Sequence, residues 1–162
     1  MSEILRMGNT PLSLAAMKGH FVIVKLLIGI EKVGTDVKDN CSRTPLSFAA
    51  WYGSDTVAKA IIVDDSIDPD QKDHYGATPL SLAVRHGHIE VVKVLLATGI
   101  VTCGSHDCLR RSVFWWAKRS RNADIEKMLA GFSKKRGIPM SADEYVDVCS
   151  ITSDHMSRYT HT

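Results

Sequence analysis

The apolar and polar positions of this chain follow one pattern several times. Three copies open with Thr-Pro-Leu-Ser, at Thr10, Thr44 and Thr78, and successive copies start 34 residues apart. In each copy an apolar stretch follows, then a glycine, then a second apolar stretch. Threonine can accept a hydrogen bond from a free helix amide, proline suits the first helical turn, and glycine ends a helix in the left-handed conformation. Each copy is therefore predicted to form two short helices and a corner, at about 11–18 and 21–28 in the first copy.

A fourth and degenerate copy begins at Ser112, another 34 residues along the chain. Val113 stands where the other copies have proline, and Arg121-Asn122 replaces the Gly-His pair, which weakens the expected corner. The inward apolar positions are kept, at Phe114, Trp116, Ala117, Ile125, Met128 and Leu129. A fixed period in this range indicates stacked repeats, and polar substitutions on a kept apolar pattern suit a terminal repeat that faces water. The fourth copy is therefore predicted to be the C-terminal cap.

The motif resembles the ankyrin repeat. The third copy carries the family's T-P-L opening at 78–80, its G-H corner at 87–88 and its apolar second helix at 91–96, and the four in-phase copies extend the match over about residues 5–130. The Thr-Pro-Leu-Ser form is similar to ankyrin arrays of filamentous fungi, which are often attached to larger signalling or immunity-type proteins.

The resemblance implies an all-α ankyrin-repeat solenoid over residues 1–130, with about four stacked helix pairs and hairpin-like tips. Its repeats would span about 5–37, 38–71, 72–105 and 106–130, the last as C-terminal cap. Residues 131–162 lose the period and are expected to form a flexible polar tail.

Aspartates open the turns expected at the tips, at Asp39, Asp73 and Asp107. Aspartate in this place can bond the backbone two residues on, and glycine suits the closing position. Gly8 and Gly76 keep the family's glycine, whereas Ser42 and Arg110 depart from it. Residues 1–9 leave little room for a full hairpin, so this edge is expected to be either a clipped cap or the cut edge of a longer array.

Composition and charge change this picture little. The net charge is +2, no apolar run approaches the ~18 residues of a membrane span, and the first residues lack the apolar segment of a signal peptide. Four cysteines follow no disulfide framework and are expected to be reduced thiols: Cys41, Cys103, Cys108 and Cys149. The chain is therefore expected to be intracellular, in the cytoplasm or the nucleus, and to have no membrane partner.

The sequence contains no motif that supports catalysis or cofactor binding. It contains no phosphate loop, no G-x-S-x-G, no H-E-x-x-H and no G-x-G-x-x-G motif. The cysteines and histidine at 103–108 match no standard zinc spacing, so no metal is expected there. The acidic run from Asp64 to Asp73 lacks the glycine and closing glutamate of a calcium loop and is interpreted as a solvated loop between repeats. Trp115-Trp116 is interpreted as packing, not as a ligand site.

The resemblance places partner contacts at the hairpin tips and at the exposed end of the first helix. In this sequence these positions are Met17, Lys18, Lys38, Asn40, Arg43, Trp51, Tyr52, Lys72, His74, Tyr75, Arg85 and His86. Trp51-Tyr52 beside Arg85-His86 would make one contiguous patch on the concave side, and large aromatics and arginine dominate binding energy in protein interfaces. The sequence therefore predicts non-catalytic binding of another protein by an isolated domain that is a monomer.

Two alternatives stay open at this point. The fourth copy and the residues after it are basic, which would suit a nuclear regulator that contacts nucleic acid, although no aromatic stacking platform accompanies the charge. Nucleic acid is accordingly the less favoured partner. The chain would alternatively be the recognition fragment of a larger signalling or immunity-type protein, with the chemistry outside these residues.

Overall fold

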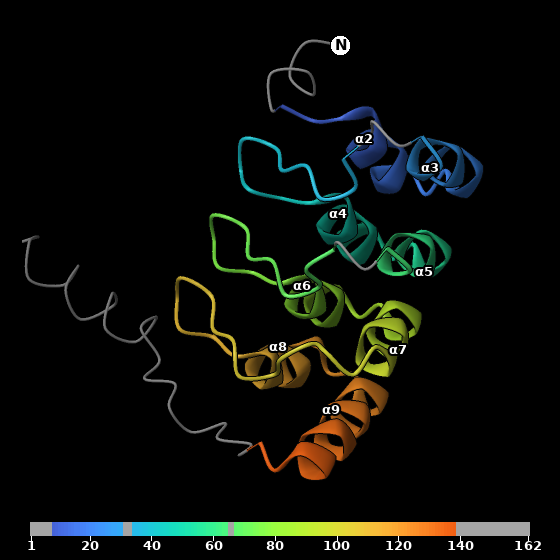
Figure 1. Cartoon of the computed structure of the whole chain (residues 1–162). Helices are drawn as coiled ribbons and strands as arrows, with labels where there is room; N and C mark the ends of the chain where they lie inside the picture. Colours follow the sequence, from blue (N-terminus) through green and yellow to red (C-terminus); the bar gives the residue numbers. More distant parts are fainter. Residues whose placement is uncertain (1–7, 31–33, 65–66, 139–162) are drawn as a thin grey trace, which may run out of the picture.

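The computed structural model describes residues 8–30, 34–64 and 67–138. These residues form eight α-helices and no β-strand, which confirms the prediction of an all-α stack. In chain order the helices are α2 (Pro11–Met17), α3 (Phe21–Ile28), α4 (Pro45–Tyr52), α5 (Asp55–Ile62), α6 (Pro79–His86), α7 (Ile89–Ala97), α8 (Val113–Ser120) and α9 (Ala123–Arg136). They pair as successive antiparallel hairpins, one pair for each predicted copy (Figure 1).

The helix pairs stack in two rows. The inner row contains α2, α4, α6 and α8, and the outer row contains α3, α5, α7 and α9, with each helix packed on its neighbours in the row (Figure 1). The leucine of each Thr-Pro-Leu-Ser copy lies at the centre of this stack, fully buried at Leu12, Leu46 and Leu80. Because no single pair could cover these side chains, the core exists only through stacking.

The start of every inner-row helix is fixed by the residue that the period predicts. Thr10, Thr44, Thr78 and Ser112 accept a hydrogen bond from the amide three residues on, at 3.1 to 3.2 Å. At Thr78 the serine of the motif completes a capping box, because Oγ of Ser81 accepts a hydrogen bond from the Thr78 amide. The serine of the motif therefore has a structural role in this repeat.

The corner after each inner-row helix requires a left-handed residue. Gly53 and Gly87 have φ angles of +78° and +75°, and Arg121 keeps the same conformation in the fourth repeat with φ +53°. The loss of glycine, expected to weaken this last corner, is thus accommodated by a strained arginine. Asn122 then caps α9 by accepting hydrogen bonds from the amides of Asp124 and Ile125.

The two central glycines should respond differently to alanine. A Cβ on Gly87 would meet nothing within 4 Å, whereas one on Gly53 would lie 2.5 Å from Nδ1 of His88. Gly87→Ala is expected to cost about 1 kcal/mol through its left-handed backbone alone, and Gly53→Ala about 1 kcal/mol more. Chemical denaturation of both variants tests this. In a His88→Ala background the two costs should become equal, and a difference that persists there would contradict the proposed clash.

The second helix of the fourth repeat is longer than expected. α9 continues through Arg136, past the boundary at 130, so residues 131–136 belong to the helix and not to a polar tail. The physical reason is that Ser133 is fully buried and Phe132 packs against the core, which keeps this end of α9 on the stack. The rest of the predicted tail, 139–162, lies outside the described residues.

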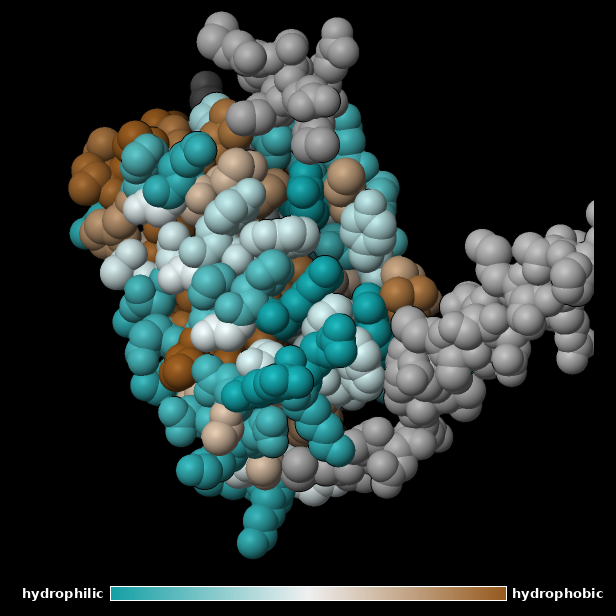
Figure 2. All heavy atoms as spheres, turned by 180° about the vertical axis from the view of Figure 1, so that it is seen from behind, coloured by the Kyte–Doolittle hydropathy of each residue, from teal (hydrophilic) through white to brown (hydrophobic). Residues whose placement is uncertain are grey.

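The first repeat exposes apolar side chains at positions that are buried in the later repeats. Ile23 is 48% exposed, although Val57, Val91 and Ile125, at the same position of the later repeats, are fully buried. Val22, Leu26 and Ile30 are also exposed. Figure 2 shows the apolar side chains gathered at this end of the molecule.

Candidate protein-binding surface

Three hairpin loops project from the inner row on the side away from the outer row (Figure 1). They comprise residues 38–43, 72–77 and 106–111. We define the inner surface as the set of these loops, the exposed residues of the inner-row helices, and Lys18. Lys18 is the residue directly after α2. All twelve contact positions predicted from the resemblance lie in these loops or at the ends of these helices.

Each loop is closed around one aspartate. Oδ1 of Asp39 accepts hydrogen bonds from the amides of Cys41 and Arg43 at 2.9 and 2.8 Å. Oδ1 of Asp73 and of Asp107 accepts the corresponding amides at 2.8 to 3.0 Å. The second oxygen of Asp39 pairs with the guanidinium of Arg43, 2.6 Å from Nη2, with the carboxylate fully buried. These aspartates therefore order the loops and leave no carboxylate free at their tips.

Successive loops are also bonded to one another. The amide of His74 donates to the carbonyl of Cys41 at 2.9 Å, and the amide of Cys108 donates to the carbonyl of Tyr75 at 2.8 Å. Ser42 and Arg110 adopt the positive φ of the glycine that they replace, with values of 59° and 58°. The loops thus keep one backbone shape although Ser42 and Arg110 replace glycine, and each loop is hydrogen-bonded to the next.

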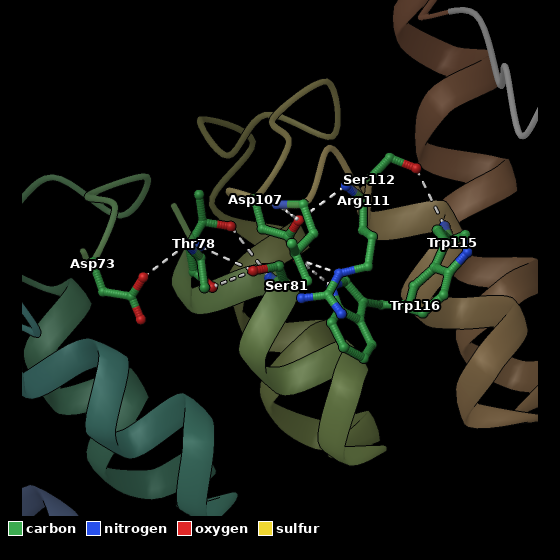
Figure 3. A network of polar contacts seen from close by, with 10 residues as sticks. Asp73, Thr78, Ser81, Asp107, Arg111, Ser112, Trp115 and Trp116 are labelled. Carbon is green, nitrogen blue, oxygen red and sulfur yellow. Dashed lines mark hydrogen bonds and ion pairs between the residues drawn. The ribbon is translucent and has the colours of Figure 1, made fainter. Parts of the chain in front are cut away.

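Arginine and tryptophan side chains connect the third and fourth repeats. The guanidiniums of Arg85 and Arg111 lie 4.5 and 4.3 Å from a ring centroid of Trp116, and Nε of Arg111 is 2.7 Å from Oδ2 of Asp107. Figure 3 shows Asp107, Arg111 and Trp116 converging beside α6. Nε1 of Trp116 also donates to Oδ2 of Asp107. The packing predicted for Trp116 therefore holds, and Arg85 is positioned on it by a cation–π contact.

A second aromatic cluster lies between the second and third repeats. The rings of Trp51 and His86 are 5.1 Å apart, and Nε2 of His88 is 2.9 Å from the carbonyl oxygen of Trp51. Partial burial lowers the pKa of His86 below its ordinary value, and the nearby charges of Arg85 and His88 lower it further. The lowered pKa favours the neutral form of the His86 imidazole. The contiguity expected for Trp51 and His86 is present in the structure.

The predicted positions differ in how free their side chains are. Trp51 and Met17 are half-buried, and Arg43 pairs with Asp39 and stacks on Phe48. Much of the surface area of these three side chains is therefore buried by contacts within the protein. Tyr52 and Tyr75 are 52% and 64% exposed. The remaining predicted residues are also exposed: Lys18, Lys38, Asn40, Lys72, His74, Arg85 and His86. Their role in binding stays a prediction.

The interpretation of the acidic run as a solvated loop is wrong for part of its length. Asp73 is buried inside its hairpin, and Oδ2 of Asp70 accepts the amide of Thr102, which belongs to the next repeat, at 2.8 Å. Burial raises the pKa of Asp70. Only Asp68 is exposed among the described members, and Asp65 lies outside the described residues. The run therefore joins two repeats, because its carboxylates satisfy backbone amides that would otherwise be unpaired.

Two structural roles were not predicted from the sequence. The spacing Asp-x-x-x-Arg occurs at 39–43 and at 107–111, and in both loops it gives the ion pair described above. That repeated spacing was available as a signal. The hydrogen bond between His88 and the Trp51 carbonyl could not be predicted, because no pattern within one repeat shows which backbone group of a neighbouring repeat lies nearby.

The described residues offer few groups for metal binding, membrane insertion or cysteine reactivity. Within the described ranges, no cluster of three or more His, Cys, Asp or Glu residues could hold a metal ion, and no helix is long and apolar enough to cross a membrane. Burial raises the pKa of the Cys103 thiol to about 11, so this cysteine is unreactive at neutral pH. Cys41 and Cys108 are free thiols.

A groove on the opposite side of the molecule is the rival binding surface. It lies between α3 and α5 in the outer row and has a volume of about 520 Å³. Its lining is mostly apolar and consists of Phe21, Lys25, Ile28, Thr56, Lys59, Ala60 and Val63. Experiments on binding must therefore distinguish this groove from the inner surface.

Comparison with curated proteins finds no match. A family model described as ankyrin repeats (3 copies) matches residues 2–73 and 65–138. The two matches cover every described helix pair, including the extension of α9 to Arg136. The chain therefore belongs to the ankyrin repeat family.

Proposed function

We propose that this chain is a non-catalytic module that recognises another protein through its inner surface. Ankyrin repeats are generally protein–protein interaction modules, and the family is typically non-catalytic. The observation that carries the proposal for this chain is the combination of exposed Tyr52 and Tyr75 with Arg85 on one ordered face. Tyrosine and arginine are enriched among the residues that contribute most binding energy in protein interfaces.

The order of this face supports the same conclusion. The loops are closed by Asp39, Asp73 and Asp107 and are bonded to one another, and Arg85 is stacked on Trp116 before any partner arrives. A surface ordered in advance loses less conformational entropy on binding than a mobile one, so more of the contact energy contributes to affinity.

A comparison of matched variants tests the proposal. Tyr52→Ala/Arg85→Ala should reduce capture of the specific partner by about tenfold or more, since it removes two large contacts from the inner surface. Thr56→Ala/Lys59→Ala changes the outer groove and should leave capture unchanged. Partners are identified and quantified by mass spectrometry, and circular dichroism checks that both variants are folded. Equal capture by the two folded variants would refute the inner surface as the binding site.

A further inference from the structure

The two rows of helices carry charge differently. The inner-row helices contain no aspartate or glutamate. The outer row mixes both signs, with acidic residues at Asp55, Glu90, Asp124 and Glu126. Two of its lysines are paired within their own helices, Lys59 with Asp55 at 2.9 Å and Lys93 with Glu90 at 2.7 Å. Negative charge on the helices is therefore confined to the outer row.

The inner row presents cations that form no ion pair with the described residues. Lys18, Arg85, Lys118 and Arg119 are exposed, and none forms an ion pair with any residue in the described part of the chain. Arg85 contacts Trp116 and Arg119 lies 6.0 Å from the ring centroid of Trp115, contacts that orient a guanidinium without neutralising it.

The loop carboxylates cannot neutralise these cations. The side chains of Asp39 and Asp107 are 0% and 5% exposed and are already paired with arginine, and Asp73 is buried beneath the amides that it accepts. The connecting segments add Asp68 as an exposed carboxylate, but it lies between the loops 38–43 and 72–77 and belongs to neither. The inner surface thus has excess positive charge although the chain as a whole is close to neutral, with a net charge of +2.

We propose that the inner surface recognises an acidic segment of a partner protein, with carboxylates placed against Arg85, Lys118 and Arg119. This inference rests on the proposed function and specifies the chemistry of the partner. Guanidinium offers a planar pair of N–H donors that matches a carboxylate, and a guanidinium already stacked on an indole loses little freedom when it forms that pair. The neighbouring Tyr52 and Trp51 supply apolar area for side chains between the carboxylates.

The spacing of the cations favours an acidic protein over a nucleic acid. They come from α2, α6 and α8 or the residue next to them, and α4 contributes aromatic residues instead of charge. Duplex DNA carries a phosphate about every 1.7 Å along its axis and is bound by dense rows of cations. An intermittent set of cations with aromatic residues between them is typical of a protein interface.

Fluorescence anisotropy with defined probes tests this proposal on the full chain. The probes are a labelled glutamate-rich peptide, its counterpart with glutamine in place of glutamate, and a single-stranded DNA of equal length. The glutamate peptide should bind about tenfold more tightly than the glutamine peptide. Arg85→Ser/Lys118→Ser/Arg119→Ser should abolish that preference. Lys59→Ser/Lys93→Ser/Lys127→Ser, which removes the same charge from the outer row, should retain it.

Residues 139–162 require a further control, because they include the four acidic residues Asp143, Glu144, Asp147 and Asp154. The titrations are repeated after these residues are replaced by their amides. The preference for the glutamate peptide should be equal or greater in that variant, since competition from the chain itself can only mask it.

Three results would overturn the inference. They are the absence of a preference for the glutamate peptide with and without the amide substitutions, its loss only in the outer-row variant, and tighter binding of the DNA through the same inner-row residues. The proposed function would survive the first of these if Tyr52→Ala/Arg85→Ala still lost its captured protein. The two proposals can therefore fail separately.

Discussion

Replacing Leu80 with alanine is expected to lower the free energy of unfolding by about 3 kcal/mol. Leu80 is fully buried at the centre of the inner row, between the helix pairs that contain its equivalents Leu46 and Phe114. The substitution removes buried apolar area and leaves a cavity that the fixed helix starts of the neighbouring repeats cannot readily close. Denaturant titration followed by circular dichroism measures the loss.

Leu26→Ala is the matched control for that experiment. It removes the same atoms from the outer row of the first repeat, but the Leu26 side chain is 67% exposed. Its cost should stay below about 0.5 kcal/mol, as for most surface substitutions. A similar loss in both variants would mean that α3 is covered in solution and would contradict the exposure described for the first repeat.

Asp39→Ala should be the next most damaging change, at about 3 kcal/mol. The carboxylate accepts two loop amides and pairs with the Arg43 guanidinium, so its removal leaves all three donors without their acceptor. The side chain of Arg43 is 19% exposed and can regain some hydration, which limits the loss.

The chain provides its own control in Asp73→Ala. Asp73 accepts the same two amides, but Ala77 stands where Arg43 stands in the earlier loop, so no ion pair is lost. Its cost should be about 1 kcal/mol smaller, measured in the same denaturant titrations. If Asp73→Ala were as costly as Asp39→Ala, the ion pair would contribute nothing measurable to the stability of the loop.

Much of the fold could be predicted because the signals are local and repeated. Thr10, Thr44 and Thr78 mark helix starts by a hydrogen bond that spans only three residues, and Pro in the first turn reinforces them. Apolar positions recurring in phase then indicate which face each helix buries. The Ser112 start was predictable in the same way, although its proline is missing.

The features that could not be predicted depend on neighbouring repeats. A left-handed Arg121 is tolerated because the stack fixes both helices around it, which no local propensity shows. Arg85 was predicted as an exposed contact, but its position on Trp116 depends on how the fourth repeat packs on the third. The end of α9 was misplaced because its last turns are polar by sequence, while Phe132 and Ser133 pack inward.

Site-specific photo-crosslinking determines whether the partner binds on the inner surface. A photoreactive amino acid is placed at Tyr52 on the inner surface, or at Val63, which is 81% exposed in the outer groove. If the partner binds on the inner surface, one identified protein crosslinks from Tyr52 and not from Val63, and Arg85→Ala weakens this crosslink. Crosslinking of that protein from Val63 alone would place the binding site in the outer groove and not on the inner surface.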